Sequence, residues 1–78
     1  MITVHKLKTW PLHFYAVTAG TKNFEIRKND RDFKEGDVLI LQCWDPETST
    51  YNGQEVAKRV KYVTEWEQKP GNVVLGLD

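Results

Sequence analysis

The most informative stretch of this sequence runs from residue 19 to residue 37 and reads AGTKNFEIRKNDRDFKEGD. It holds five basic residues (Lys22, Arg27, Lys28, Arg31 and Lys34) among five acidic ones (Glu25, Asp30, Asp32, Glu35 and Asp37). Charges at this density cannot all be buried, because a buried charge needs a partner. The stretch therefore predicts surface turns together with a few charged side chains held in fixed geometry.

Residues 24–27 carry the strand signal of this stretch. Two apolar residues, Phe24 and Ile26, alternate with two charged residues, Glu25 and Arg27. A period of two places these pairs on opposite faces of a β-strand, and we expect the charged pair to point outward from the core. The polar segment that follows is rich in Asn and Asp, which favour turns because their side chains bond the nearby backbone.

The flanking sequence predicts one helix and four further strands. The strands are expected at residues 3–8, 37–44, 55–66 and 73–77, and the helix at residues 11–19. Pro11 suits the first turn of the helix, where its missing N–H needs no partner. Gly20 suits the position just after the last turn.

The apolar spacing predicts which faces are buried. In the helix, Leu12, Tyr15 and Ala16 recur at helical spacing and are expected to face the core. Residues 37–44 are apolar on both faces, which predicts a central strand buried on each side. Residues 34–37, just before it, are expected to form a solvated turn.

The second half of the chain predicts a hairpin. Residues 45–53 contain Pro and Asn-Gly and are expected to connect two antiparallel strands. In the second of these strands, four residues are expected on one face: Val56, Val60, Tyr62 and Trp66. We therefore predict a mainly β (α+β) fold, with a mostly antiparallel sheet that curls into a barrel to remove its edges and one short N-terminal helix.

Composition narrows the class of protein. Seventy-eight residues are near the lower limit for one hydrophobic core, so we expect a single domain over residues 1–78. The lone Cys43 excludes an internal disulfide and is expected to be a buried apolar residue. The formal net charge is zero, but residues 1–34 hold seven basic residues against three acidic ones. An anionic partner is therefore expected to contact this half.

Location and cofactors are also addressed by the sequence. No charged segment followed by an apolar run opens the chain, and no apolar run approaches about 18 residues, so we expect a cytoplasmic protein that does not contact a membrane. His5 and His13 stand alone, and no cluster has the spacing of metal ligands. We predict no metal and no cofactor, and we assume a monomer.

The pattern Gly20-x-Lys22-x-x-Glu25-Ile26-Arg27, followed by Phe33-x-x-Gly36-Asp37-x-Leu39, resembles the signature of the ASCH domains, relatives of the PUA RNA-binding barrels. The run from Phe24 to Phe33, with His5, Leu7, Lys8 and Pro11 before it, is similar to a small phage and bacterial branch described as a domain of unknown function. The resemblance covers nearly the whole chain. It implies a PUA-like barrel of mixed strands and an association with RNA.

The resemblance also implies two catalytic alternatives, since small ASCH members include deacylases of acetylated cytidine and nucleases. The deacylase motif is Gly-x-Lys-x-x-Thr-x-Arg, in which Lys activates Thr. This chain keeps Lys22 and Arg27 but has Glu25 in the Thr position. A carboxylate does not replace a hydroxyl nucleophile, although it can act as a general base for water. We therefore expect a binding protein and assign no catalytic residue; an enzyme would use Lys22 and Glu25.

Lys22, Glu25 and Arg27 form the candidate ligand site. A carboxylate between two cations presents a fixed acceptor to a base amino group, and the cations can hold a phosphate or a base carbonyl. The alternative is a structural ion pair at one end of the barrel. Further candidates for ligand contact are Lys8, Trp10, His5, Lys28 and Arg31.

Three of these further candidates have an open alternative. Trp10 offers a stacking face for a base, or packs over the start of the helix. His5 bonds into the pocket or is a structural histidine. Arg31 forks onto a phosphate or onto a carboxylate with equal ease.

The sequence thus predicts an RNA- or nucleotide-binding module that recognises an unpaired or modified base in a polar pocket. Zero net charge favours contact with one base over broad phosphate binding. The two alternatives are a small hydrolase, either a nucleoside deacylase or a nuclease, and a non-catalytic phage interaction protein that uses the barrel as a scaffold.

Overall fold

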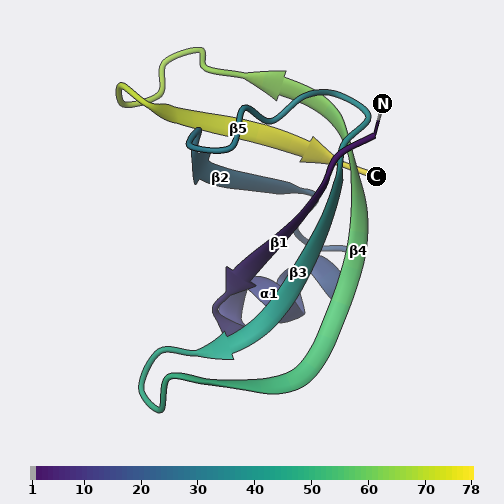
Figure 1. The fold of residues 1–78 in the computed structure, drawn as a ribbon, viewed down its shortest axis with the longest axis vertical. Helices are drawn as coiled ribbons and strands as arrows, with labels where there is room; N and C mark the ends of the chain where they lie inside the picture. The colour runs from purple at the N-terminus through teal and green to yellow at the C-terminus, as the bar shows by residue number, and fades with distance from the viewer. Residues whose placement is uncertain (1) are drawn as a thin grey trace.

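The computed structural model describes residues 2–78, which form five strands and one helix (Figure 1). In chain order these are β1 (Val4–Thr9), α1 (Pro11–Thr18), β2 (Phe24–Lys28), β3 (Val38–Asp45), β4 (Thr50–Thr64) and β5 (Asn72–Leu77). The predicted order of elements is confirmed. The hairpin turn is shorter than predicted, because β4 already begins at Thr50 and pairs it with Asp45.

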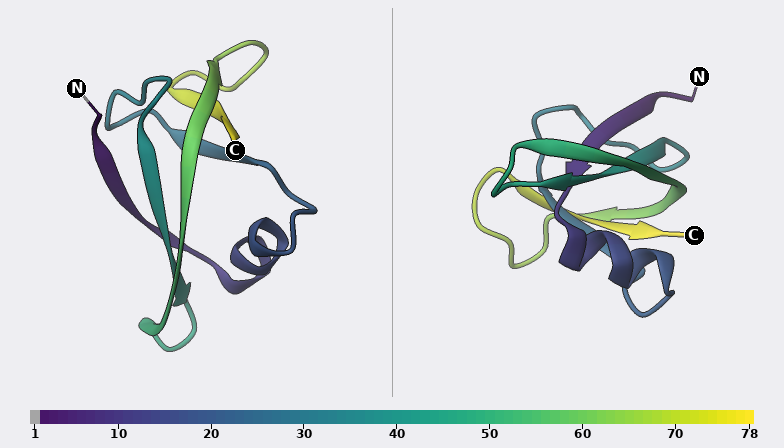
Figure 2. Two further views of the ribbon diagram at one scale, coloured as in Figure 1. Left: turned by 90° about the vertical axis from the view of Figure 1, so that its right-hand side faces the viewer. Right: turned by 90° about the horizontal axis from the view of Figure 1, so that it is seen from below.

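The strands form one mixed sheet in the order β1-β3-β4-β5-β2. β1 pairs with β3 in parallel, and the other three pairings are antiparallel. The sheet curves strongly, and α1 lies on one side of it (Figure 2). β1 and β2 are both edge strands, and no backbone ladder joins them in the described part of the chain. The sheet is therefore not closed by backbone pairing, in contrast to the expected barrel.

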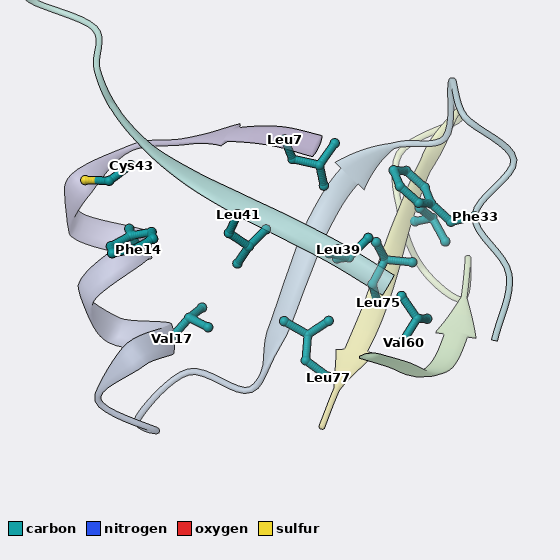
Figure 3. Packing of buried hydrophobic residues seen from close by; sticks show 11 residues of the cluster. Leu7, Phe14, Val17, Phe33, Leu39, Leu41, Cys43, Val60, Leu75 and Leu77 are labelled. Carbon is teal, nitrogen blue, oxygen red and sulfur yellow. The ribbon is translucent and has the colours of Figure 1, made fainter. Parts of the chain in front are cut away.

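The core lies inside this curve and is capped by the helix. It consists of Leu7, Phe14, Val17, Phe33, Leu39, Leu41, Cys43, Val60, Val73, Leu75 and Leu77. Figure 3 shows Phe14 and Val17 of α1 near Leu41 and Cys43 of β3, with Phe33 at the opposite end. Cys43 is buried as predicted.

The buried face of α1 differs from the prediction. Phe14 and Val17, three residues apart, are buried, whereas Leu12 is 78% exposed and Tyr15 is 48% exposed. The helix is apolar around most of its circumference, so its spacing alone could not select the face that contacts β3. Its end is as predicted, with Gly20 at a positive φ of 79° and its N–H donating to Val17 O.

The faces of β2 are inverted relative to the prediction. Glu25 is 3% exposed, whereas Phe24 is 40% and Ile26 is 53% exposed. The charged pair is therefore on the inner side of this edge strand. Glu25 can be buried because Lys22, three residues before it, and Arg27, two residues after it, both bond its carboxylate, so the buried charge is paired.

Three further differences concern the exposed side chains of β3, of β4 and of the residues after β4. The β4–β5 register shifts between Val60 and Tyr62, which turns Tyr62 outward, 58% exposed, while Val63 packs against the core. Trp66 follows the end of β4 and is 69% exposed. The central strand β3 buries one face fully and the other only in part.

Asp37 is also buried, in contrast to the predicted solvated turn. Its carboxylate bonds His5 Nε2 at 2.9 Å and accepts from the backbone N–H of Lys34 at 3.1 Å and of Thr3 at 3.4 Å. Burial raises the pKa of this carboxyl, but the hydrogen bonds from His5 and from the two backbone groups outweigh it and hold the pKa below its ordinary value. These bonds join the start of β1 to the turn before β3.

Candidate functional site

A pocket of about 580 Å³ brings together most of the predicted site residues. Its lining is Lys8, Thr9, Trp10, His13, Lys22, Phe24, Glu25, Ile26 and Arg27. Lys22, Glu25, Arg27, Lys8 and Trp10 were predicted, and they come from three separate parts of the fold: β1 and the residue after it, the loop after α1, and β2. The volume lies within the range of small-molecule sites.

The pocket occupies the gap between the two edges of the sheet. One wall comes from the end of β1 and the start of α1, and the other from consecutive residues 24–27 of β2. Four consecutive residues of β2, whose side chains lie on both faces of the strand, contribute to the lining, so the cavity wraps around the free edge of that strand. The open sheet therefore creates the site that a closed backbone ladder would fill.

Glu25 is the buried centre of the polar side. Lys22 Nζ lies 2.9 Å from Glu25 Oε1, and Arg27 Nε lies 3.1 Å from Glu25 Oε2. The Glu25 side chain is 4% exposed, while those of Lys22 and Arg27 are 16% and 24% exposed. The carboxylate thus lies beneath two cations that still reach solvent. It fixes the positions of both cations and neutralises one of their charges.

Lys22 also contacts α1 and an aromatic ring. Its Nζ lies 3.3 Å from Nδ1 of His13 and 5.4 Å from the centroid of the Phe24 ring. A lysine ammonium can only donate, so this contact places the His13 proton on Nε2. His13 was not predicted, because a lone exposed histidine in a helix carries no local signal. Only the packing of α1 over the loop brings it to the pocket.

Arg27 spans the gap between the two sheet edges. Its Nη2 donates to Lys8 O at 3.0 Å and to Thr9 Oγ1 at 3.1 Å, while its Nε contacts Glu25. The guanidinium fork is therefore largely occupied within the protein. Arg27 is a bridge as well as a pocket residue, a role that its position on a short strand did not reveal.

Aromatic and apolar side chains form the remaining wall. Trp10, which precedes α1, is 55% exposed, and Phe24 and Ile26 are also exposed at the pocket. Exposed aromatic rings beside charged groups offer stacking surfaces for a planar ligand. If the charged pair had been assigned to the buried face of β2, the alternation of residues 24–27 would have identified Phe24 and Ile26 as exposed pocket residues.

Three predicted residues lie outside the pocket. His5 is buried, bonds Asp37 and meets the edge of the Phe33 ring, with 4.8 Å between ring centroids. Arg31 donates to Lys6 O at 3.0 Å. Lys28, at the end of β2, is exposed. The histidine is structural, and Arg31 bonds a backbone carbonyl rather than a carboxylate.

Lys8 is only partly a pocket residue. It lines the cavity, but its Nζ lies 4.7 Å from the centroid of the Trp44 ring, a cation–π contact outside the lining. Its backbone carbonyl, which accepts from Arg27, is the part of Lys8 that shapes the site.

Within residues 2–78, no group of three or more His, Cys, Asp or Glu side chains is arranged to hold a metal ion. No helix in the same range has the length and hydrophobicity that a membrane-spanning segment needs.

Comparison with known proteins shows the family. The model of a family described as "Domain of unknown function (DUF3850)" matches residues 4–77. The chain is also 35% identical over 65 residues to "Uncharacterized 12.9 kDa protein in GpA 3'region" of Escherichia phage P2, an alignment that covers 83% of this chain and 58% of that relative. The family match runs from the first residue of β1 to the last of β5 and includes every pocket residue. The chain therefore belongs to the DUF3850 family.

Proposed function

We propose that this protein binds RNA or a nucleotide-like ligand by holding one unpaired or modified base in the pocket. The observation that carries the proposal is the convergence of Lys22, Glu25 and Arg27 beneath exposed Trp10 and Phe24. Single-stranded RNA is recognised by stacking splayed bases on aromatic rings and by bonding their edges. This pocket combines both kinds of surface in one cavity.

The charges favour one base over an extended phosphate track. Within the pocket, Glu25 offsets one of the two cations that contact it, so a small positive excess remains. A weak dependence of affinity on salt follows, because few counterions are released. The kinship with ASCH and PUA-like domains and a cytoplasmic location are further parts of this proposal.

The direct test is the binding of short single-stranded RNA, measured by fluorescence anisotropy at two salt concentrations. Trp10→Ala is expected to weaken binding by about fivefold to a hundredfold, because stacking on an aromatic side chain contributes about 1–3 kcal/mol per base. The matched control is Trp66→Ala, which removes another exposed tryptophan that lies outside the pocket lining. Equal affinities of these two variants would refute the pocket as the RNA site.

Charge is tested separately. Lys22→Ala is expected to weaken binding, whereas Lys34→Ala, which removes an exposed lysine outside the lining, is not. Loss of binding in both variants to the same degree would indicate general attraction to phosphate and would contradict recognition in the pocket.

The hydrolase alternative uses the same residues. Both carboxylate oxygens of Glu25 already accept from a cation, and the hydroxyl of Thr9 donates to Leu7 O at 3.3 Å while it accepts from Arg27. A general base needs hydrogen-bond access to the proton it removes, so these contacts favour binding. Turnover of acetylated cytidine that both Lys22→Ala and Glu25→Ala abolish would replace the binding proposal by the catalytic one.

A further inference from the structure

The two edge strands of the open sheet, β1 and β2, differ in how the backbone groups on their free edges are bonded. The N–H of Val38, the first residue of β3, donates to Thr3 O, just before β1. Given the register of the two strands, the backbone N–H and C=O groups of the odd-numbered residues of β1 point toward β3, and those of the even-numbered residues point toward the gap. The even-numbered carbonyls of Lys6 and Lys8 are bonded by Arg31 and Arg27. The free edge of β1 is thus capped by guanidinium groups.

Among residues 2–78, no side chain is bonded to the backbone groups on the free edge of β2 at the pocket. Leu77 N donates to Asn23 O and Asn29 N to Gly71 O, and the β2–β5 register between them is unshifted. The odd-numbered residues of β2 therefore bond β5. The backbone N–H and C=O of Phe24 and Ile26 point the other way, toward the gap that contains the pocket.

The free N–H and C=O of one such edge residue can bind a ligand through two adjacent hydrogen bonds. The N–H and C=O of one extended residue lie side by side on the same edge, and in a ladder they bond one residue of the next strand twice. A planar ring with a donor next to an acceptor can make the same two bonds. The Watson–Crick edge of each unmodified base has such a pair, for example N3–H beside O4 in uracil.

We propose that the backbone edge of β2 at Ile26, flanked by that of Phe24, reads the Watson–Crick edge of the bound base. This inference rests on the proposed function and narrows it to bases whose Watson–Crick nitrogens are not methylated. Trp10 then supplies the stacking face, and Lys22, held by Glu25, lies within the same cavity to meet a base carbonyl.

The same contacts argue against a peptide strand as the occupant. An added strand pairs continuously along a sheet edge. Here the gap beyond Ile26 is crossed by the side chains of Arg27 and Arg31 as they reach the carbonyls of β1. Only two residues of the open segment, Phe24 and Ile26, direct their backbone N–H and C=O toward the gap. A segment this short fits a ring and not an extended chain.

The experiment compares RNA pairs that differ only at the Watson–Crick edge. Pentamers of A, C, G and U are titrated first, and the best binder is then compared with the same pentamer methylated on the Watson–Crick nitrogen, such as 3-methyluridine for uridine. We expect at least about tenfold weaker binding of the methylated pentamer, because it leaves an enclosed donor or acceptor unpaired. Equal binding of both overturns this inference but leaves the proposed function standing. If no pentamer binds at all, the proposed function itself fails.

Amide hydrogen exchange gives a readout that no stacking contact would produce. In the free protein, the amides of Glu25 and Arg27 are expected to be protected by their bonds to β5, and that of Ile26 to exchange rapidly. Saturation with the best pentamer is expected to slow Ile26 at least about tenfold. An unchanged Ile26 rate at saturation overturns the inference. Protection that extends to Lys28, as an added strand would cause, also overturns it.

A backbone substitution completes the test. Ile26→Pro deletes the edge-facing N–H and removes no bond to β5, and proline is tolerated on edge strands for this reason. It is expected to weaken binding of the unmethylated pentamer about as much as methylation does, whereas the control Ile26→Val is not. Full affinity of a folded Ile26→Pro variant refutes the inference. If that variant fails to fold, the methylation and exchange measurements still decide.

Discussion

Glu25→Gln is the substitution that most directly tests how the site is held. Glutamine has nearly the shape of glutamate but no charge, and one of its two polar atoms is a donor. The Glu25 carboxylate accepts from Lys22 at 2.9 Å and from Arg27 at 3.1 Å while 4% of the side chain is exposed. After the change, one cation loses its acceptor and faces an NH₂ group instead.

The expected cost follows from these contacts. A hydrogen bond to a charged group contributes about 1.5–3 kcal/mol, and breaking a fully buried ion pair costs about 3–5 kcal/mol. Because the Lys22 and Arg27 side chains are 16% and 24% exposed, water compensates part of the loss. We therefore expect a decrease of about 2 kcal/mol in the free energy of unfolding. For a domain of this size, that decrease lowers Tm by about 8–16 °C.

The assay is urea denaturation at pH 7, followed by tryptophan fluorescence and repeated as a thermal melt. Glu35→Gln is the matched control, since Glu35 is exposed and lies outside the pocket lining; its stability is expected to stay within about 0.5 kcal/mol of wild type. If Glu25→Gln is as stable as this control, Glu25 is not the buried acceptor that holds the two cations. The positions assigned to Lys22 and Arg27 would then be wrong.

Three further predictions follow from individual contacts. Asp37→Asn is expected to lower the free energy of unfolding by about 1–3 kcal/mol at pH 7, because the introduced NH₂ group meets hydrogen-bond donors. Since folding lowers the pKa of Asp37, the contribution of this carboxylate to stability is complete above the ordinary pKa of 3.8 and is lost as the pH falls below that value. In urea titrations between pH 6 and pH 3, the difference between wild type and Asp37→Asn should therefore shrink only at the acid end, and a constant difference would contradict this. Phe14→Ala should cost about 3–5 kcal/mol and Leu12→Ala less than about 0.5 kcal/mol, since one side chain is 2% exposed and the other 78%; equal losses in thermal melts would restore the helix face that the sequence suggested. Arg27→Lys keeps the charge but loses the Nη2 that bonds Lys8 O and Thr9, so it should destabilise the fold by about 1–2 kcal/mol in urea denaturation; wild-type stability of this variant would show that the bridge to β1 contributes nothing.

Turn chemistry and element order could be predicted from local sequence. The helix stop at Gly20 depends on a backbone conformation with positive φ, which glycine adopts without strain, and the structure has φ at 79° there. The strand pattern of residues 24–27 and the apolar run of β3 are equally local. Their types were confirmed because each depends only on neighbours within a few residues.

The assignment of faces could not be predicted in the same way. The charged pair of β2 lies on the inner side because Lys22, from the preceding loop, and Arg27 together satisfy Glu25. The helix buries Phe14 rather than Leu12 because of how it contacts β3. The helix has more than one face apolar enough to be buried, and its contact with β3 selects one of them. In β2 the charged face is buried, because Lys22 and Arg27 pair the Glu25 carboxylate and Arg27 reaches β1.

The candidate site shows the same division. Local sequence is enough to group Lys22, Glu25 and Arg27, because they lie within six residues at and just before the start of one strand. The unpaired edges of β1 and β2, the bridge that Arg27 makes between them, and the pocket lined by Trp10 and His13 arise only in the folded protein. The physical reason is that a gap between two sheet edges exists only once all five strands are in register. No residue of the segment from 19 to 37 carries that information alone.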